Sequence, residues 1–223
     1  EMTSSLVGSE MCIRDSTGTF ASWKLQPLTK EYFMWFTLLS VGVFGFFVST
    51  DLFTMFMFYE VALIPMYLLI GVWGSGRKEY AAMKLTLMLM GGSAFLLIGI
   101  LGIFYGAGGE TMNLLEIAKL HIPHEMQRIF FPLIFLGFGV LGALFPFHTW
   151  SPDGHASAPT AVSMLHAGVL MKLGGYGCFR VAMYLMPEGA AMWGDVFLIL
   201  TTISVVYGLS LIHISEPTRL DVI

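Results

Sequence analysis

The sequence predicts an all-α protein, a polytopic bundle of about six transmembrane helices of which one is discontinuous. Of its 223 residues, 56% are hydrophobic and only 12% are charged, and the mean hydropathy is +0.76. These values lie outside the range of soluble globular chains. The apolar residues gather in runs near or above the roughly 20 residues that a helix needs to cross the bilayer. The chain is therefore expected to be an integral membrane protein.

The same numbers exclude other classes. The net charge of −4 is small and scattered, so no basic patch for nucleic acid is expected. Two cysteines are too few for a disulfide framework. His148 and His155 are seven residues apart with Asp153 between them, a spacing that matches no common metal site. We expect no metal and no nucleic-acid partner.

The two ends differ from the rest in composition and periodicity. The strings "LVGSEMCIRDS" and "LSLIHISEPTR" are the translations of one oligonucleotide and of its reverse complement, and this oligonucleotide resembles a transposase-based sequencing adapter. We therefore interpret residues 1–16 and 209–223 as adapter-derived tails and exclude them from fold reasoning. Residues 17–208 are interpreted as a transmembrane helical domain that is an internal fragment of a longer protein.

Six membrane crossings follow in order along residues 17–208. They are Tyr32–Ser49, Leu52–Trp73, Tyr80–Tyr105, a run from Ile129 into the polar stretch that follows it, Thr160–Met186, and a run that begins near Trp193. Arg77 and Lys78 lie in a short connector, so the positive-inside rule predicts that this end is cytoplasmic. The external connector, Gly106–Arg128, is expected to hold a short surface helix.

Two charged residues lie close to the expected bilayer midplane. Glu60 follows Asp51 by nine residues, which places it roughly 13 Å deep, and Lys172 lies midway between Pro159 and Pro187. A charge near the bilayer centre costs about 2.5 to 3.5 kcal/mol on insertion scales, so each is a functional candidate. We expect Glu60 and Lys172 to form a coupled pair that takes up and releases protons. The alternative is a static ion pair that only holds helices together.

Two further residues are weaker candidates. Lys84 lies close to the start of its helix, so it either reaches a buried partner or snorkels to the interface. His166 lies on the same helix as Lys172, six residues away, and should point to a different face. A lone histidine in an apolar helix is more often a hydrogen-bonded core residue than a proton carrier.

The stretch "LFPFHTWSPDGHASAP", Leu144 to Pro159, interrupts the apolar runs. Pro146 and Pro152 each remove a backbone donor, so we expect the helix to break there. The break begins roughly 20 Å into the membrane, where irregular backbone is tolerated only beside protein or an aqueous cavity. Broken helices of this kind mark ion paths in transporters. We expect a proton route beside the break, with His148 supplying a group that titrates near neutrality; the alternative is an ordinary cytoplasmic loop.

Three stretches carry a specific resemblance over nearly all of residues 17–208. They are "FYEVALIPMYLLIGVWG", "AAMKLTLMLMGGS" and "PFHTWSPDGHASAPTAVSMLHAGVLMKLGGYGCFR". Together they resemble the antiporter-like membrane subunits of proton-pumping NADH:quinone oxidoreductase, respiratory complex I, and above all the type called subunit M or chain 4. The resemblance implies that this fragment covers about the fourth to the ninth of the fourteen helices of such a subunit.

The resemblance also implies functional residues. The family's fifth-helix glutamate maps onto Glu60, its eighth-helix lysine onto Lys172, and its broken seventh helix onto the stretch that includes His148. Family members usually carry a lysine just before the break, whereas this sequence has Leu141 in "FGVLGALFPFHTW". Two compensations are conceivable: Lys84 becomes the partner of Glu60, or His166 and His148 carry the middle of the proton path.

The resemblance implies that this chain carries no cofactor of its own, with NADH, FMN, iron–sulfur clusters and quinone bound by other subunits. Its expected partners are the other membrane subunits of the complex, the lipid bilayer and protons, in a bacterial inner membrane. Two alternatives stay open: a subunit of a multi-subunit sodium/proton antiporter or membrane-bound hydrogenase, or a structural membrane subunit that transports nothing.

Overall fold

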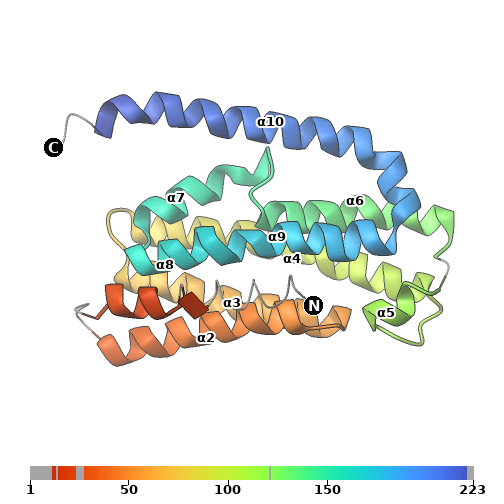
Figure 1. Cartoon of the computed structure of the whole chain (residues 1–223), viewed down its shortest axis with the longest axis horizontal. Helices are drawn as coiled ribbons and strands as arrows, with labels where there is room; N and C mark the ends of the chain where they lie inside the picture. Colours follow the sequence, from red (N-terminus) through yellow and green to blue (C-terminus); the bar gives the residue numbers. More distant parts are fainter. Residues whose placement is uncertain (1–11, 14, 24–27, 121, 220–223) are drawn as a thin grey trace.

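Long antiparallel helices form the bundle that the apolar runs predict (Figure 1). The computed structural model describes residues 12–13, 15–23, 28–120 and 122–219, with side chains as far as residue 210. Helix is the only regular secondary structure within these ranges, apart from one isolated bridge between Asp51 and Asn113. The all-α prediction is confirmed.

Four of the helices are long and apolar enough to span a membrane. They are α2 (Thr29–Val48), α3 (Leu52–Trp73), α4 (Lys78–Gly106) and the Pro187–Ser210 part of α10 (Pro187–Arg219). The helix α3 continues through Pro65. Of the predicted tails, residues 12–13 and 15–16 are helical and α10 continues to Arg219, while residues 1–11, 14 and 220–223 lie outside the described residues. The proposed origin of the tails stays a prediction.

Glycines bring the helices into close contact. A Cβ atom added at Gly42 of α2 would lie 3.0 Å from the backbone of Ala62 in α3. A Cβ atom at Gly99 of α4 would lie 2.2 Å from Ile134 in α6. Small residues let helix backbones approach closely in membranes, where packing rather than the hydrophobic effect drives helix association. These contacts set the spacing of the bundle.

The external connector differs from the surface helix that the sequence predicts. Its helix α5 is a single turn, Leu114–Ile117, and Leu114 and Ile117 are each only 1% exposed. The side chain of Asn113 caps this turn by accepting from the N–H of Leu115. The turn therefore packs onto the end of the bundle, because its two apolar side chains gain more from the core than from the surface.

The other two crossings are made of shorter segments. The first is α6 (His124–Leu141), a 3₁₀ turn η1 (Phe147–Thr149) and α7 (Trp150–Ser157). The second is α8 (Thr160–Leu165), the π-helical η2 (His166–Leu170), α9 (Met171–Gly177) and the π-helical η3 (Cys178–Met183). Figure 1 shows the α6–α7 break near the middle of the bundle's long axis. The discontinuous helix is confirmed, and the alternative of an ordinary loop beyond the bundle is wrong.

The end of α6 is held by local hydrogen bonds. The N–H of Leu144 donates to the carbonyl of Gly139, and the N–H of Ala143 donates to that of Val140. This is the Schellman pattern, in which the residue after the C-cap is left-handed. Ala143 occupies that position with a φ of 56°. The indole Nε1 of Trp150 also donates to the carbonyl of Val140 at 3.1 Å, so α7 is tied to the last turn of α6.

Pro152 does not break the helix, contrary to the prediction. It lies in the first turn of α7, where the backbone N–H has no helical partner and its loss costs little. The irregular backbone is therefore confined to residues 142–146 and 158–159. Opposite the first of these, Gly174 of α9 approaches so closely that an added Cβ would lie 2.5 Å from the backbone nitrogen of Gly142.

Candidate functional site

The candidate site is a set of polar side chains inside the apolar bundle, around the α6–α7 break. Four buried nitrogen or oxygen atoms on candidate residues have no hydrogen-bond partner among the described residues. They are Glu60 Oε1, His148 Nδ1, and Nδ1 and Nε2 of His166. A buried polar atom without a partner costs about 1 to 3 kcal/mol, so such atoms are rare in proteins and mark functional positions.

Glu60 lies on α3 and is half-buried. Its neighbour Tyr59 is buried and donates its O–H to the carbonyl of Leu89 at 3.0 Å, which fixes α3 against α4 at this height. Tyr59 therefore anchors the helix, while the buried Oε1 of Glu60 accepts no hydrogen bond.

Lys172 is exposed on α9. The helix α9 packs chiefly against α6, whereas α3 packs against α2 and α4. The ion pairs between described side chains include none that joins Lys172 to Glu60, and the expected coupling of the two groups stays a prediction. His166 is fully buried on the other side of this crossing, which confirms that the two residues point to different faces.

Lys84 pairs with Asp153 and not with Glu60. Its Nζ lies 2.6 Å from Oδ2 of Asp153 on α7, and its ammonium also lies 5.8 Å from the ring centre of Tyr80. The first proposed compensation for Leu141 is therefore not the arrangement that the structure shows, because Asp153 satisfies the ammonium. Leu141 itself is fully buried in the last turn of α6.

His166 is the most enclosed titratable side chain of the break. Its exposed fraction is 0%, and its ring stacks on Trp150 and on His155, with centroid distances of 5.3 Å and 4.4 Å. Nδ1 of His155 lies 3.0 Å from Oγ of Ser163. The imidazole of His166 is thus packed through its ring faces, and neither ring nitrogen has a hydrogen-bond partner among the described residues. Both nitrogens can therefore take part in proton exchange.

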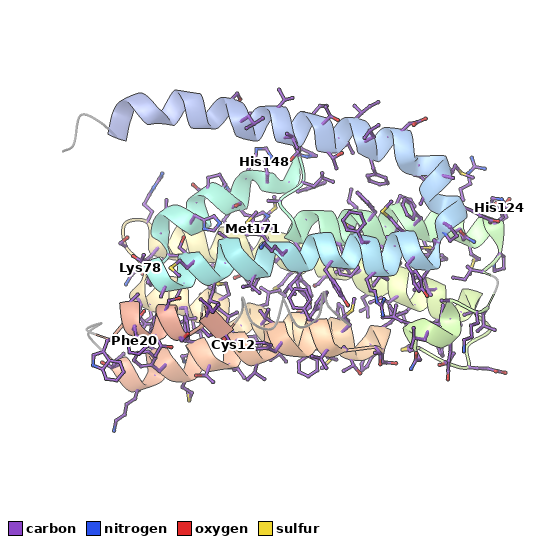
Figure 2. The ribbon with its side chains drawn as sticks, in the orientation of Figure 1. Cys12, Phe20, Lys78, His124, His148 and Met171 are labelled. Atoms are coloured by element: carbon purple, nitrogen blue, oxygen red, sulfur yellow. The ribbon has the colours of Figure 1, made fainter. Side chains whose placement is uncertain are left out.

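His148 lies apart from this stack. Its ring packs against Phe145 at 5.6 Å and against Tyr207 of α10 at 4.8 Å. Figure 2 shows His148 at the break, facing α10, with Met171 deeper in the bundle. The break therefore presents two histidines in different surroundings, His148 toward α10 and His166 against α7.

A large apolar cavity separates α10 from the rest of the bundle. It has a volume of about 610 Å³ and lies between α6, α9, η3 and α10. Cys178 is the one titratable residue among the described residues that line it, so we seek the proton carriers elsewhere.

Two functional candidates escaped the sequence analysis. Asp153 and His155 entered it only as an unsuitable metal spacing, yet one pairs with Lys84 and the other stacks on His166. Lys84 and Asp153 are 69 residues apart, so no local spacing could reveal their contact. The signal available was the presence of three titratable residues within one short polar segment.

Comparison with known proteins places this arrangement in a family. Residues 49–215 match the family described as NADH:quinone oxidoreductase/Mrp antiporter, transmembrane. NAD(P)H-quinone oxidoreductase chain 4 3 of Picosynechococcus sp. is 38% identical over 190 residues, which cover 85% of this chain and 34% of that protein.

Two solved structures share the fold. A chain of respiratory complex I from Thermus thermophilus with bound NADH has a TM-score of 0.79 at 26% identity, covering 89% of this chain and 42% of that one. A chain of the membrane-bound sulfane sulfur reductase, an archaeal respiratory membrane complex, has a TM-score of 0.77 at 28% identity, covering 87% and 41%. This chain thus spans about a third of the curated relative's length. It is an integral membrane protein, and it belongs to the NADH:quinone oxidoreductase/Mrp antiporter transmembrane family.

Proposed function

We propose that this chain is part of a proton-translocating membrane subunit of an NADH:quinone oxidoreductase. The observation that carries the proposal is the set of buried titratable atoms that find no hydrogen-bond partner in the described part of the chain, on Glu60, His148 and His166, in a bundle with a broken transmembrane helix. An apolar bundle that served only structure would gain stability by replacing these groups with hydrophobic side chains.

The proposed chemistry is reversible protonation. Glu60 binds a proton at its carboxylate and releases it, and the neutral imidazole of His166 accepts a proton at one ring nitrogen while the other carries a hydrogen. Lys172 and His148 are proposed as further carriers. Because His166 stacks on Trp150 of α7 and Lys84 is already paired with Asp153, we favour the histidines over Lys84 as the replacement for the lysine that the family usually carries at the position of Leu141.

The driving event lies outside this chain in the proposal. Quinone reduction elsewhere in the complex would change the electrostatic environment or conformation of the subunit, and the buried groups would respond by moving protons. NADH, FMN, iron–sulfur clusters and quinone would be bound by other subunits, which are the proposed partners of this chain. The relatives support this placement by name, since one is a quinone oxidoreductase chain and one belongs to complex I.

The test replaces Glu60 by Gln in the full-length subunit of the assembled complex. Proton uptake into inverted membrane vesicles and NADH oxidation are measured together. We expect Glu60→Gln to lower the number of protons moved per electron, because the amide cannot bind a proton. Glu79→Gln is the matched control, since Glu79 is an exposed carboxylate at the start of α4. Unchanged translocation in Glu60→Gln contradicts the proposal, and translocation that requires sodium favours the antiporter alternative.

A further inference from the structure

A polar cavity opens at the Arg77 end of the bundle. It has a volume of about 210 Å³ and lies between the 74–77 turn, the start of α4 and one face of α7. Its lining is Ser75, Gly76, Arg77, Tyr80, Ala81, Asp153, Ala156 and Ser157. The turn is fixed on α7, because the N–H of Ser75 donates to the carbonyl of Ser157 at 2.8 Å. The walls of the cavity are therefore held together by a hydrogen bond, and one of them includes the carboxylate of Asp153.

The helix α7 separates this cavity from the buried histidines. Asp153 lines the cavity and holds Lys84 at 2.6 Å, with the two side chains 38% and 25% exposed. The next residue, Gly154, lies against the histidine ring, since an added Cβ would be 3.6 Å from Cε1 of His166. His155 then stacks on His166 at 4.4 Å. One turn of helix thus connects the polar cavity to the most enclosed titratable ring of the break.

We propose that this cavity is the mouth of the proton path on the Arg77 side, and that the Lys84–Asp153 ion pair controls it; this rests on the proposed function. While the pair is closed, the ammonium occupies the carboxylate. When the pair opens, Asp153 takes up a proton that reaches it from the bulk along cavity water, and the neutral carboxyl passes this proton, by way of water, to His155. With Nδ1–H of His155 donating to Oγ of Ser163, Nε2 is the nitrogen that accepts the proton, and His155 passes it on, by way of water, to the unprotonated ring nitrogen of His166.

Gly154 lets the backbone of α7 lie close to both Leu85 and His166. A Cβ at this position would lie 3.0 Å from Cδ1 of Leu85 as well as against His166. A larger residue would require Leu85 and the His166 ring to give way, and we expect this to weaken the packing of α7 on α4. The close approach of α7 therefore keeps the Lys84–Asp153 ion pair next to the stacked rings of His155 and His166.

Thiol labelling tests whether the cavity is a mouth. Ala156 is exposed and lines the cavity, so Ala156→Cys is made in the full-length subunit with Cys178→Ser as background. A membrane-impermeant thiosulfonate is added to the assembled complex from either side of the membrane. We expect labelling from the Arg77 side alone, and a loss of proton translocation on labelling that the background variant does not show. Labelling that leaves translocation unchanged would overturn the proposal.

Removal of one charge at a time tests whether the Lys84–Asp153 ion pair controls the proton path. Asp153→Asn is expected to lower the protons moved per electron while NADH oxidation continues, and Lys84→Met to alter the same ratio with the carboxylate left in place. Glu79→Gln again serves as control. If Glu60→Gln is impaired and Asp153→Asn translocates like the parent complex, the mouth lies elsewhere while the proposed function stands. If Asp153→Asn fails to assemble, the labelling of Ala156→Cys decides.

Discussion

At the scale of single residues, ring nitrogens of His148 and His166 are buried near the break and form no hydrogen bond with the described residues. His166 is held by ring stacking rather than by hydrogen bonds, which allows a direct separation of packing from proton transfer. The same side chain would be a poor choice for a purely structural position, since its nitrogens gain no partner in return for burial.

Replacement of His166 by Phe therefore has a specific expected outcome. The phenyl ring keeps an aromatic face toward Trp150 and His155, but because it is larger than imidazole in a fully buried site, we expect it to lower the free energy of unfolding by about 1 to 3 kcal/mol. The complex should assemble, which blue-native electrophoresis measures, but move fewer protons per electron. Full translocation in the His166→Phe complex would remove this residue from the path.

Ala143 gives a prediction on stability alone. Its φ of 56° places an L-residue in the left-handed region, which costs roughly 1 to 2 kcal/mol relative to glycine. Ala143→Gly should raise the free energy of unfolding by about 1 kcal/mol, less the entropy that glycine adds to the unfolded chain. Ala143→Val should lower it, because a β-branched side chain tolerates this conformation least. Thermal unfolding of the solubilised protein ranks the three, and the reverse order would contradict the Schellman assignment.

At the scale of elements, α4 and α6 are held together by a line of close glycine contacts. Gly99→Ala should cost about 1 to 3 kcal/mol, because the new methyl group would lie within 2.2 Å of Ile134 Cγ1. Gly91→Ala on the same helix is the matched control, since nothing lies within 4 Å of its added Cβ. There alanine should stabilise the helix by up to about 1 kcal/mol. Equal effects of the two substitutions, measured by unfolding in mixed micelles, would contradict this packing.

The elements also show what the sequence could predict. Apolar run length predicts α2, α3, α4 and α10, because crossing a bilayer sets a minimum length that composition alone reveals. The break was predicted from prolines and glycines, but Pro152 was assigned to irregular backbone although a first-turn proline is compatible with helix. The single turn α5 was expected at the surface, because periodicity does not tell which apolar surface a short helix meets.

The candidate site was predictable only in part. Depth along a helix singled out Glu60 and Lys172, since burial of charge is costly wherever it occurs. Contacts between distant segments were not accessible in this way. The pairing of Lys84 with Asp153 and the stacking of His155 on His166 depend on how α7 turns back toward α4 and α8. These contacts are also the ones that the proposed proton mouth uses.

At the scale of the whole molecule, the polar groups divide between the two ends and the middle of the bundle. The polar cavity and the Lys84–Asp153 pair lie toward the Arg77 end, and His166 and Glu60 lie within the bundle. At the opposite end, the buried Gln127 accepts from the N–H of Gly189 and so ties α6 to the start of α10. Gln127 also donates to the carboxylate of Glu188, which lies 3.4 Å from Nδ1 of His124, whereas at the Arg77 end a lysine–aspartate pair borders a polar cavity.

The central claim is that the charged side chains expected near the bilayer midplane move protons and do not merely hold helices together. Lys172 tests it most directly, because its side chain is exposed on α9 and its removal leaves the described core packing intact. The measurement is the number of protons moved per electron by the full-length Lys172→Met subunit in the assembled complex. We predict a complex that assembles and oxidises NADH but moves fewer protons. A complex that fails to assemble, or one that assembles and translocates like the parent, would contradict the claim.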